Sequence, residues 1–166
     1  YQGAQLIVTI NASPYHMGKS RLREDILKAQ ARKNKVFIAY TNLVGGQDEL
    51  VFDGSSLIIN DKGKVVARAA SFAEDLLIFD MDIPASKKRQ KVFLKDIASD
   101  KPALCQRVSL TAKDEAQEVY EALVLGLKDY ILKNGFKKVV LGLSGGMDSS
   151  LVAGLAADSV GSENVI

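Results

Sequence analysis

The stretch from residue 139 to residue 157 constrains the fold of this chain more than any other. Its run 139–143 is short, apolar and partly β-branched, which is typical of a buried parallel strand. A serine- and glycine-rich loop follows at 144–150, and the apolar run 151–157 predicts the first turns of a buried helix. A helix that starts after such a loop presents free backbone N–H groups at the positive end of its dipole. The stretch therefore predicts an anion site, most simply for phosphate.

Asp148 is unusual in this loop, because it places an anion where anions are expected to bind. Two explanations are open. Asp148 caps the helix, or it holds Mg²⁺, which brings the phosphate charge with it. The loop also lacks the Gly-Lys-Ser/Thr ending of a Walker loop, which argues against an enzyme that transfers the γ-phosphate.

The pattern Ser-Gly-Gly-x-Asp-Ser at 144–149 resembles the pyrophosphate loop of the N-type ATP pyrophosphatases. The resemblance implies that ATP is cut between its α and β phosphates and that the loop holds the leaving pyrophosphate. It implies Asp148 as a ligand of Mg²⁺. It also implies a set of ATP-binding residues in the loop: Gly142, Leu143, Ser144, Gly145, Gly146, Met147, Asp148 and Ser149. The alternative is an ordinary glycine-rich turn between a strand and a helix.

The first half of the chain alternates short apolar runs with turn signals, which predicts an α/β domain with antiparallel parts. We predict a helix over 20–34 and strands over 4–10, 36–40, 56–59, 65–68 and 76–81. The runs 56–59 and 65–68 flank Asn-Asp-Lys-Gly-Lys and therefore predict a hairpin. The segment 45–49 is predicted as a loop from its two glycines and its polar residues.

The pattern of apolar and polar residues changes at Pro84, where the second half of the chain begins. Weak periodicity predicts a connector over 84–110. A long amphipathic helix is then predicted, with Thr111 as its N-cap and with Asn134-Gly135 as its stop signal. The predicted domains are accordingly 1–83 and 111–166, joined by the connector.

Two further resemblances fit this division. The segments 11–15 (Asn-Ala-Ser-Pro-Tyr) and 49–54 (Glu-Leu-Val-Phe-Asp-Gly) resemble the C-terminal half of a nitrilase-type amidohydrolase. The segments 126–130 and 133–136, with the phosphate loop, resemble the start of an NAD synthetase domain. Their order resembles the glutamine-dependent NAD⁺ synthetase family. The resemblance implies an α/β chain: part of a nitrilase-type α-β-β-α sandwich, then the first helix, strand, loop and helix of a parallel-sheet adenine nucleotide hydrolase-like (PP-loop) domain.

The family resemblance implies a ligase that amidates deamido-NAD⁺ to NAD⁺ through an adenylated intermediate. It implies ATP and Mg²⁺, with ammonia supplied by glutamine hydrolysis. Ser13 and Lys19 match glutamine-binding positions, with Lys19 as a point charge for the substrate carboxylate. The catalytic Glu, Lys and Cys are expected upstream of Tyr1, so we expect a segment of a longer protein without glutaminase activity of its own. Cys105 follows Pro102 in the predicted connector, is expected to have no nearby His or Lys to lower its pKa, and is assigned no catalytic role.

Two alternatives remain open from the residues. One is another PP-loop ligase, such as GMP synthetase, asparagine synthetase or a tRNA-thiolating enzyme. The other is a nitrilase-type amidase with a nucleotide-binding module. The net charge of +2 argues against nucleic acid as a partner, and no apolar run is long enough to span a membrane. A single cysteine fits a cytoplasmic enzyme. Small-molecule substrates and a homo-oligomeric parent protein are expected.

Overall fold

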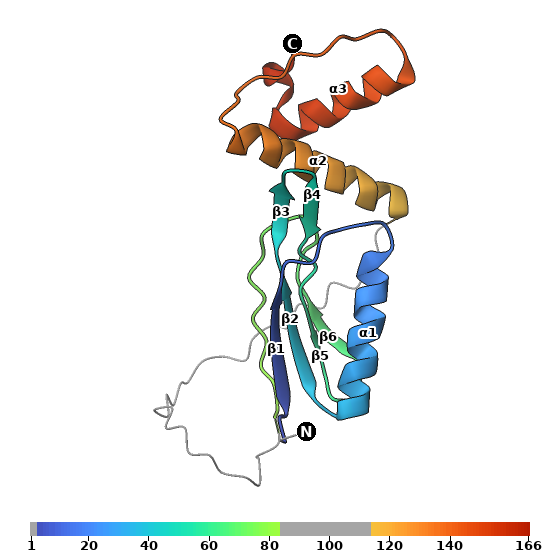
Figure 1. Ribbon diagram of the computed structural model, residues 1–166, viewed down its shortest axis with the longest axis vertical. Helices are drawn as coiled ribbons and strands as arrows, with labels where there is room; N and C mark the ends of the chain where they lie inside the picture. The colour runs from blue at the N-terminus through green and yellow to red at the C-terminus, as the bar shows by residue number, and fades with distance from the viewer. Residues whose placement is uncertain (1–2, 84–113) are drawn as a thin grey trace.

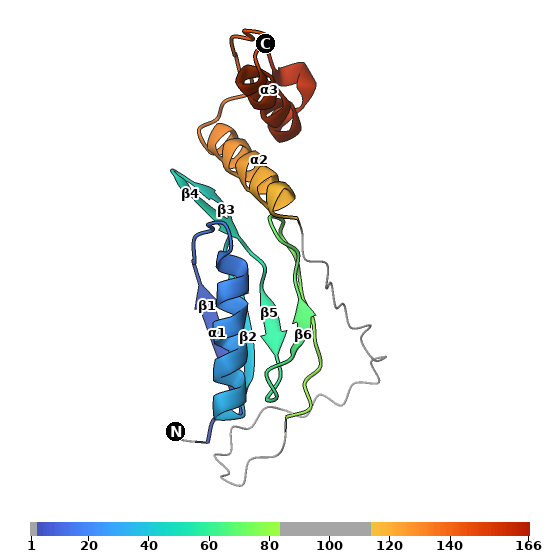
Figure 2. The same cartoon turned by 90° about the vertical axis from the view of Figure 1, so that its right-hand side faces the viewer.

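The computed structural model describes residues 3–83 and 114–166 (Figures 1 and 2). In chain order its elements are β1 (Leu6–Asn11), α1 (Lys19–Asn34), β2 (Phe37–Asn42), β3 (Val44–Gln47), β4 (Leu50–Asp53), β5 (Leu57–Ile59), β6 (Val65–Arg68), α2 (Glu115–Lys133), α3 (Met147–Val160) and the 3₁₀ turn η1 (Ser162–Asn164). The predicted connector, including Cys105 and Thr111, lies outside the described residues.

The main sheet has the strand order β1-β2-β5-β6. Strands β1 and β2 are parallel, with Leu6 opposite Phe37, and α1 makes the crossover between them. The pairs β2–β5 and β5–β6 are antiparallel, so the predicted hairpin over 56–68 is confirmed. Figure 2 shows α1 lying along one face of the sheet. One helix layer on one sheet is half of the predicted α-β-β-α sandwich.

The core lies between α1 and the sheet. It is formed by apolar side chains that alternate along β2 and β5 and meet the inner face of α1: Ala31, Val36, Ile38, Tyr40, Leu57, Ile59 and Val65. Strand β1 has Val8 63% and Ile10 85% exposed, so its outward face is uncovered by the described residues. The sheet is therefore packed on one face only in the part of the chain that the structure describes.

The predicted loop at 45–49 is wrong for residues 45–47, which lie in β3 of an antiparallel hairpin with β4, whereas residues 48–49 form the turn between these strands. Two glycines in a strand weaken it, which is why the pattern favoured a loop. In the structure, α2 packs directly over this strand, and a Cβ on Gly46 would lie 3.0 Å from the Cα of Gly126. The glycines thus permit a close approach of strand and helix.

The predicted strand at 76–81 is also wrong. This segment has no regular secondary structure, and its apolar side chains are largely exposed, with Leu76 at 77% and Ile78 at 55%. An extended segment needs a neighbouring backbone to form a ladder. The structure places no paired strand beside it among the described residues.

The C-terminal part begins with α2, whose N-cap is Asp114 rather than the predicted Thr111. Figure 1 shows α2 lying across the tip of the β3–β4 hairpin, with α3 on its other side. The predicted strand at 139–143 is present only as a parallel bridge between Val139 and Val165. The Leu141 amide extends this parallel contact by donating to the carbonyl of Ile166, at 2.9 Å. Within the described ranges, none of the helices has the length and apolar character needed to cross a bilayer.

Candidate functional sites

The predicted phosphate loop does lead into a helix N-terminus. Helix α3 begins at Met147, and Gly146 is its N-cap with an extended backbone. Gly145 has φ +81°, a conformation that favours glycine, and a Cβ there would meet no atom within 4 Å. No side chain caps the helix, so its first N–H groups stay available. The geometry therefore suits an anion at this turn.

Serine hydroxyls fix the shape of the loop. Ser144 Oγ lies 3.0 Å from Ser149 Oγ, which closes the turn from both ends. Ser149 and Ser150 each donate to the carbonyl of Gly146, at 3.1 and 2.8 Å. The loop is thus held by its own side chains while its glycines stay exposed.

Asp148 is exposed in the first turn of α3. The interpretation that it caps the helix is wrong, because Gly146 is the N-cap and no side chain makes a capping hydrogen bond. The described residues contain no group of three or more His, Cys, Asp or Glu side chains that could hold a metal. A single carboxylate still fits Mg²⁺, which usually binds one or two carboxylates together with substrate phosphates.

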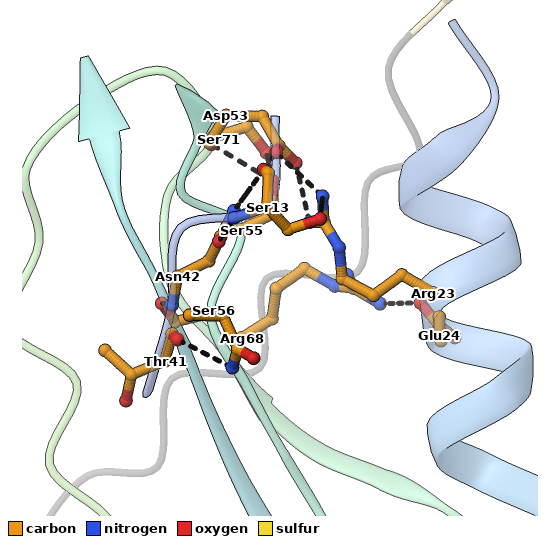
Figure 3. A network of polar contacts seen from close by, with 11 residues as sticks. Ser13, Arg23, Glu24, Thr41, Asn42, Asp53, Ser55, Ser56, Arg68 and Ser71 are labelled. Carbon is orange, nitrogen blue, oxygen red and sulfur yellow. Dashed lines mark hydrogen bonds and ion pairs between the residues drawn. The ribbon is translucent and has the colours of Figure 1, made fainter. Parts of the chain in front are cut away.

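Ser13 lies in a buried polar network between the β1–α1 loop and the ends of β2 and β4 (Figure 3). Its amide donates to Asn42 Oδ1 at 2.9 Å, and Asn42 Nδ2 donates back to the Ser13 carbonyl at 3.3 Å. Its hydroxyl accepts from Arg23 Nη2 at 3.4 Å. Ser13 is thus held through both its backbone and its side chain.

A bidentate ion pair between Arg23 and Asp53 lies under Ser13. Arg23 Nη1 and Nη2 each lie 3.0 Å from one carboxylate oxygen of Asp53. The side chains are 9% and 1% exposed, and Asn42 also donates to Asp53 at 3.3 Å. The Arg23 guanidinium lies 5.5 Å from the centre of the Tyr40 ring. Burial raises the pKa of the Tyr40 phenol, and Arg23 and Ser13 oppose this rise only in part, so the phenol stays neutral.

Lys19 is the first residue of α1 and is partly exposed. Its amide donates to the carbonyl of His16 at 3.0 Å, which anchors the start of the helix. The structure places it at the other end of the Ser13 loop and outside the Arg23 network. Its ammonium forms no ion pair with another described residue, so it is free to meet an anion.

Sequence reasoning missed Arg23, Asn42 and Asp53 as parts of the site. One signal was available for Arg23, since it lies one helical turn before Leu27, which packs against the core. A charged residue on the core face of a helix calls for a buried partner. The identity of that partner depends on a contact 30 residues away, which periodicity does not supply.

Helix α2 lies between the β3–β4 hairpin and α3 (Figure 1). The Ser13 loop is tied to β4, because the Tyr15 amide donates to the Val51 carbonyl at 2.6 Å. A groove of about 750 Å³ separates this loop from α2 and α3, and Leu123 and Leu155 contribute to its far wall. Helix α2 therefore contacts the elements of both candidate sites.

Family models match both halves of the chain. The carbon-nitrogen hydrolase model matches residues 1–89, and the NAD synthase model matches residues 119–166. The first model contains the Ser13 network, and the second contains the phosphate loop. The two predicted resemblances are confirmed at the level of family.

Curated relatives match almost the whole chain. Glutamine-dependent NAD(+) synthetase of Aquifex aeolicus is 50% identical over an alignment of 179 positions, which covers 98% of this chain and 31% of that protein. The same enzyme of Thermotoga maritima is 41% identical, with coverage of 99% and 31%. The chain thus spans less than a third of the length of these relatives.

Solved structures of the same family as these relatives also match the chain. A glutamine-dependent NAD⁺ synthetase from Acinetobacter baumannii in complex with ADP matches with a TM-score of 0.75 and 36% identity, over 97% of this chain and 28% of that one. The enzyme from Cytophaga hutchinsonii matches with a TM-score of 0.71 and 27% identity, over 98% and 25%. The α/β fold class and the order of the two segments are therefore confirmed.

Proposed function

The chain belongs to the carbon-nitrogen hydrolase family, and from this premise we propose that it is part of an enzyme that forms NAD⁺ from deamido-NAD⁺, ATP and glutamine. The observation that carries the proposal is the succession of a hydrolase segment and an NAD synthase segment in one chain. The relatives that match both segments are named glutamine-dependent NAD(+) synthetases. An amidase would supply ammonia, and a nucleotide-binding domain would use it.

A carboxylate resists attack by ammonia, because its oxygen is a poor leaving group. In the proposed reaction the nicotinate carboxylate attacks the α-phosphorus of ATP and releases pyrophosphate. Ammonia then displaces AMP from the adenylate and yields NAD⁺. The task of the protein in the first step is to stabilise negative charge on the departing pyrophosphate.

The phosphate loop offers three groups for this task. Its glycines let the backbone approach a phosphate closely, and the start of α3 supplies N–H donors and a positive dipole end. Ser144 and Ser149 can add hydroxyl donors if a phosphate replaces their contacts with each other and with the Gly146 carbonyl. Asp148 would hold Mg²⁺, which supplies charge neutralisation of the phosphates when it is bound.

The hydrolase segment would bind glutamine through Ser13 and Lys19. The described residues contain no cysteine, and Cys105 lies outside them, so a nucleophile from elsewhere in the whole protein is required. We therefore expect the 166-residue chain to release no glutamate from glutamine. Detection of glutamate release by the purified chain would contradict this expectation.

The full-length protein tests the proposal. It is incubated with deamido-NAD⁺, ATP, Mg²⁺ and either glutamine or ammonium. We expect NAD⁺, AMP and pyrophosphate in equal amounts. We expect the Asp148→Ala variant to lose NAD⁺ formation with both nitrogen donors. Asp158→Asn is the matched control, because Asp158 is a carboxylate of the same helix that lies outside the phosphate loop. It accepts a 2.7 Å hydrogen bond from the Tyr120 hydroxyl.

Release of ADP and phosphate instead of AMP and pyrophosphate would contradict the proposed chemistry. Full activity of the Asp148→Ala variant would remove the metal role from Asp148.

We further propose that the whole protein is a cytoplasmic homo-oligomer. Light scattering after size-exclusion chromatography tests the oligomer, and cell fractionation tests the location.

A further inference from the structure

Ser13 is fixed on three sides by two side chains that meet at one carboxylate (Figure 3). Asn42 holds its backbone through a reciprocal pair of hydrogen bonds, of 2.9 and 3.3 Å. Arg23 holds its hydroxyl at 3.4 Å. Both side chains also bind Asp53, Arg23 through two contacts of 3.0 Å and Asn42 through one of 3.3 Å. Asp53 therefore fixes the positions of both groups relative to Ser13.

The burial of this network keeps its geometry rigid. Asp53 is 1% exposed, and Arg23 and Asn42 are 9% and 6% exposed. A bidentate guanidinium–carboxylate pair fixes direction as well as distance. At this depth no bulk water competes for the contacts, so a change of one member is transmitted to the others.

The direction of the hydrogen bond at Ser13 has a chemical consequence. A guanidinium has no acceptor, so Arg23 must donate and the Ser13 oxygen must accept. The serine hydroxyl hydrogen then faces the Tyr40 phenol, whose pKa it helps to lower, and it can turn from this neutral oxygen to a stronger, charged acceptor. A carboxylate oxygen is such an acceptor, and the Lys19 ammonium at the other end of the same loop adds charge of the correct sign.

We propose that Arg23, Asn42 and Asp53 are positioning residues that fix Ser13 as a hydrogen-bond donor to a carboxylate oxygen of the glutamine substrate. This inference rests on the proposed function. None of the three residues touches the substrate in the proposal. They act through Ser13 alone, which separates them from residues that bind glutamine directly.

The test measures glutamate release by the full-length enzyme at varied glutamine concentration. Arg23→Lys keeps the charge but loses the planar fork. We expect it to raise the KM for glutamine about tenfold, with kcat changed less than twofold, because substrate binding is affected more than chemistry. In a Ser13→Ala background the same change should raise KM by less than twofold, since its route of action is already removed.

Arg68→Lys is the matched control. Arg68 pairs with Glu24, the residue next to Arg23 on α1, and this pair is partly buried, with both side chains 19% exposed. It makes no contact with Ser13 among the described residues. We expect its KM for glutamine to stay within twofold of the wild type.

Several outcomes would overturn the inference. One is an unchanged KM in Arg23→Lys; another is a full tenfold effect of Arg23→Lys in the Ser13→Ala background; a third is an equal rise in Arg68→Lys. If Arg23→Lys does not fold, as judged by thermal unfolding, Asn42→Ala takes its place with the same expected results. The measurement of glutamate release depends only on the glutamine site and does not depend on NAD⁺ formation. An enzyme that hydrolyses glutamine but forms no NAD⁺ from added ammonium would therefore contradict the proposed function and leave this measurement decisive.

Discussion

The backbone amide of Gly46 donates a 2.7 Å hydrogen bond to the Asp129 carboxylate, across 83 residues of sequence. Lys133 pairs with Asp129 at 3.2 Å and also donates to the Gly46 carbonyl. Two side chains of α2 thus satisfy both backbone groups of one residue in β3. The β3–β4 hairpin of the hydrolase segment and helix α2 of the synthase segment are therefore joined by hydrogen bonds between side chains of α2 and the backbone of β3.

This contact predicts that Gly46→Ala destabilises the protein. The added Cβ would lie 3.0 Å from the Cα of Gly126 and 3.3 Å from its carbonyl oxygen, and backbone atoms cannot move aside as a flexible side chain can. We expect a loss of about 1–3 kcal/mol in the free energy of unfolding, as for overpacked cores. Urea denaturation monitored by circular dichroism measures it.

Gly154→Ala is the control for this variant. Gly154 lies inside α3, and a Cβ there meets no atom within 4 Å. Alanine is favoured over glycine in a helix interior, so we expect a gain of roughly 0.5–1 kcal/mol. Equal stability of the Gly46 and Gly154 variants would contradict the close packing of α2 on β3.

The end of α1 gives a second prediction, of opposite sign. Lys35 follows the helix with φ 53° and ψ 50°, the left-handed conformation that glycine adopts without strain. We expect Lys35→Gly to stabilise the protein by about 0.5–1 kcal/mol. Lys33→Gly, two residues earlier and inside the helix, should instead cost about 1 kcal/mol. If both variants lose stability to the same extent in thermal melts, the left-handed cap is not formed.

The elements that were predicted correctly are those whose secondary structure is indicated by the local sequence pattern alone. The β5–β6 hairpin has a turn signal between two apolar runs, and α1 has a continuous periodic pattern, so both were found. The strand β3 was missed because the reason for Gly45 and Gly46 lies in α2, about 80 residues later. Local pattern carries no information on such a close approach.

The same contrast holds for the candidate sites. The phosphate loop is local, since its glycines, serines and helix start are consecutive, and its geometry was predicted from their order. The network around Ser13 joins four segments, so Arg23 and Asp53 were visible only once β1, α1, β2 and β4 were placed. A buried ion pair requires both partners, and the place of Arg23 on the core face of α1 indicates one of them without identifying the other.

The ion-pair cluster of Glu24 predicts how stability depends on pH. Burial by itself would raise the pKa of the Glu24 carboxyl, but hydrogen bonds from Lys28 and Arg68 outweigh it, and the pKa is lowered from its ordinary 4.5. The ionised form is therefore favoured by folding. Its contribution is present above about pH 4.5 and is lost as the pH falls through the lower folded-state value.

We expect Glu24→Gln to be less stable than the wild type at pH 7, by about 1 kcal/mol for a partly exposed cluster. The difference should shrink steadily below pH 4.5 as the wild type loses its ionised carboxylate. Denaturation midpoints at a series of pH values between 7 and 3 measure this. A difference that stays constant over the whole range would show that Glu24 does not titrate with a lowered pKa.

The phosphate loop gives the last prediction, which compares two adjacent glycines. Gly145 has φ +81°, whereas Gly146 has φ −85° and ψ 166°, which any residue adopts. An alanine at 145 costs roughly 1–2 kcal/mol in the loop conformation, and an alanine at 146 costs little. We therefore expect Gly145→Ala to weaken binding of pyrophosphate to the full-length protein about tenfold, with a smaller effect of Gly146→Ala. Isothermal titration with magnesium pyrophosphate measures both. A stronger effect at 146 than at 145 would mean that the bound loop does not keep the positive φ of Gly145.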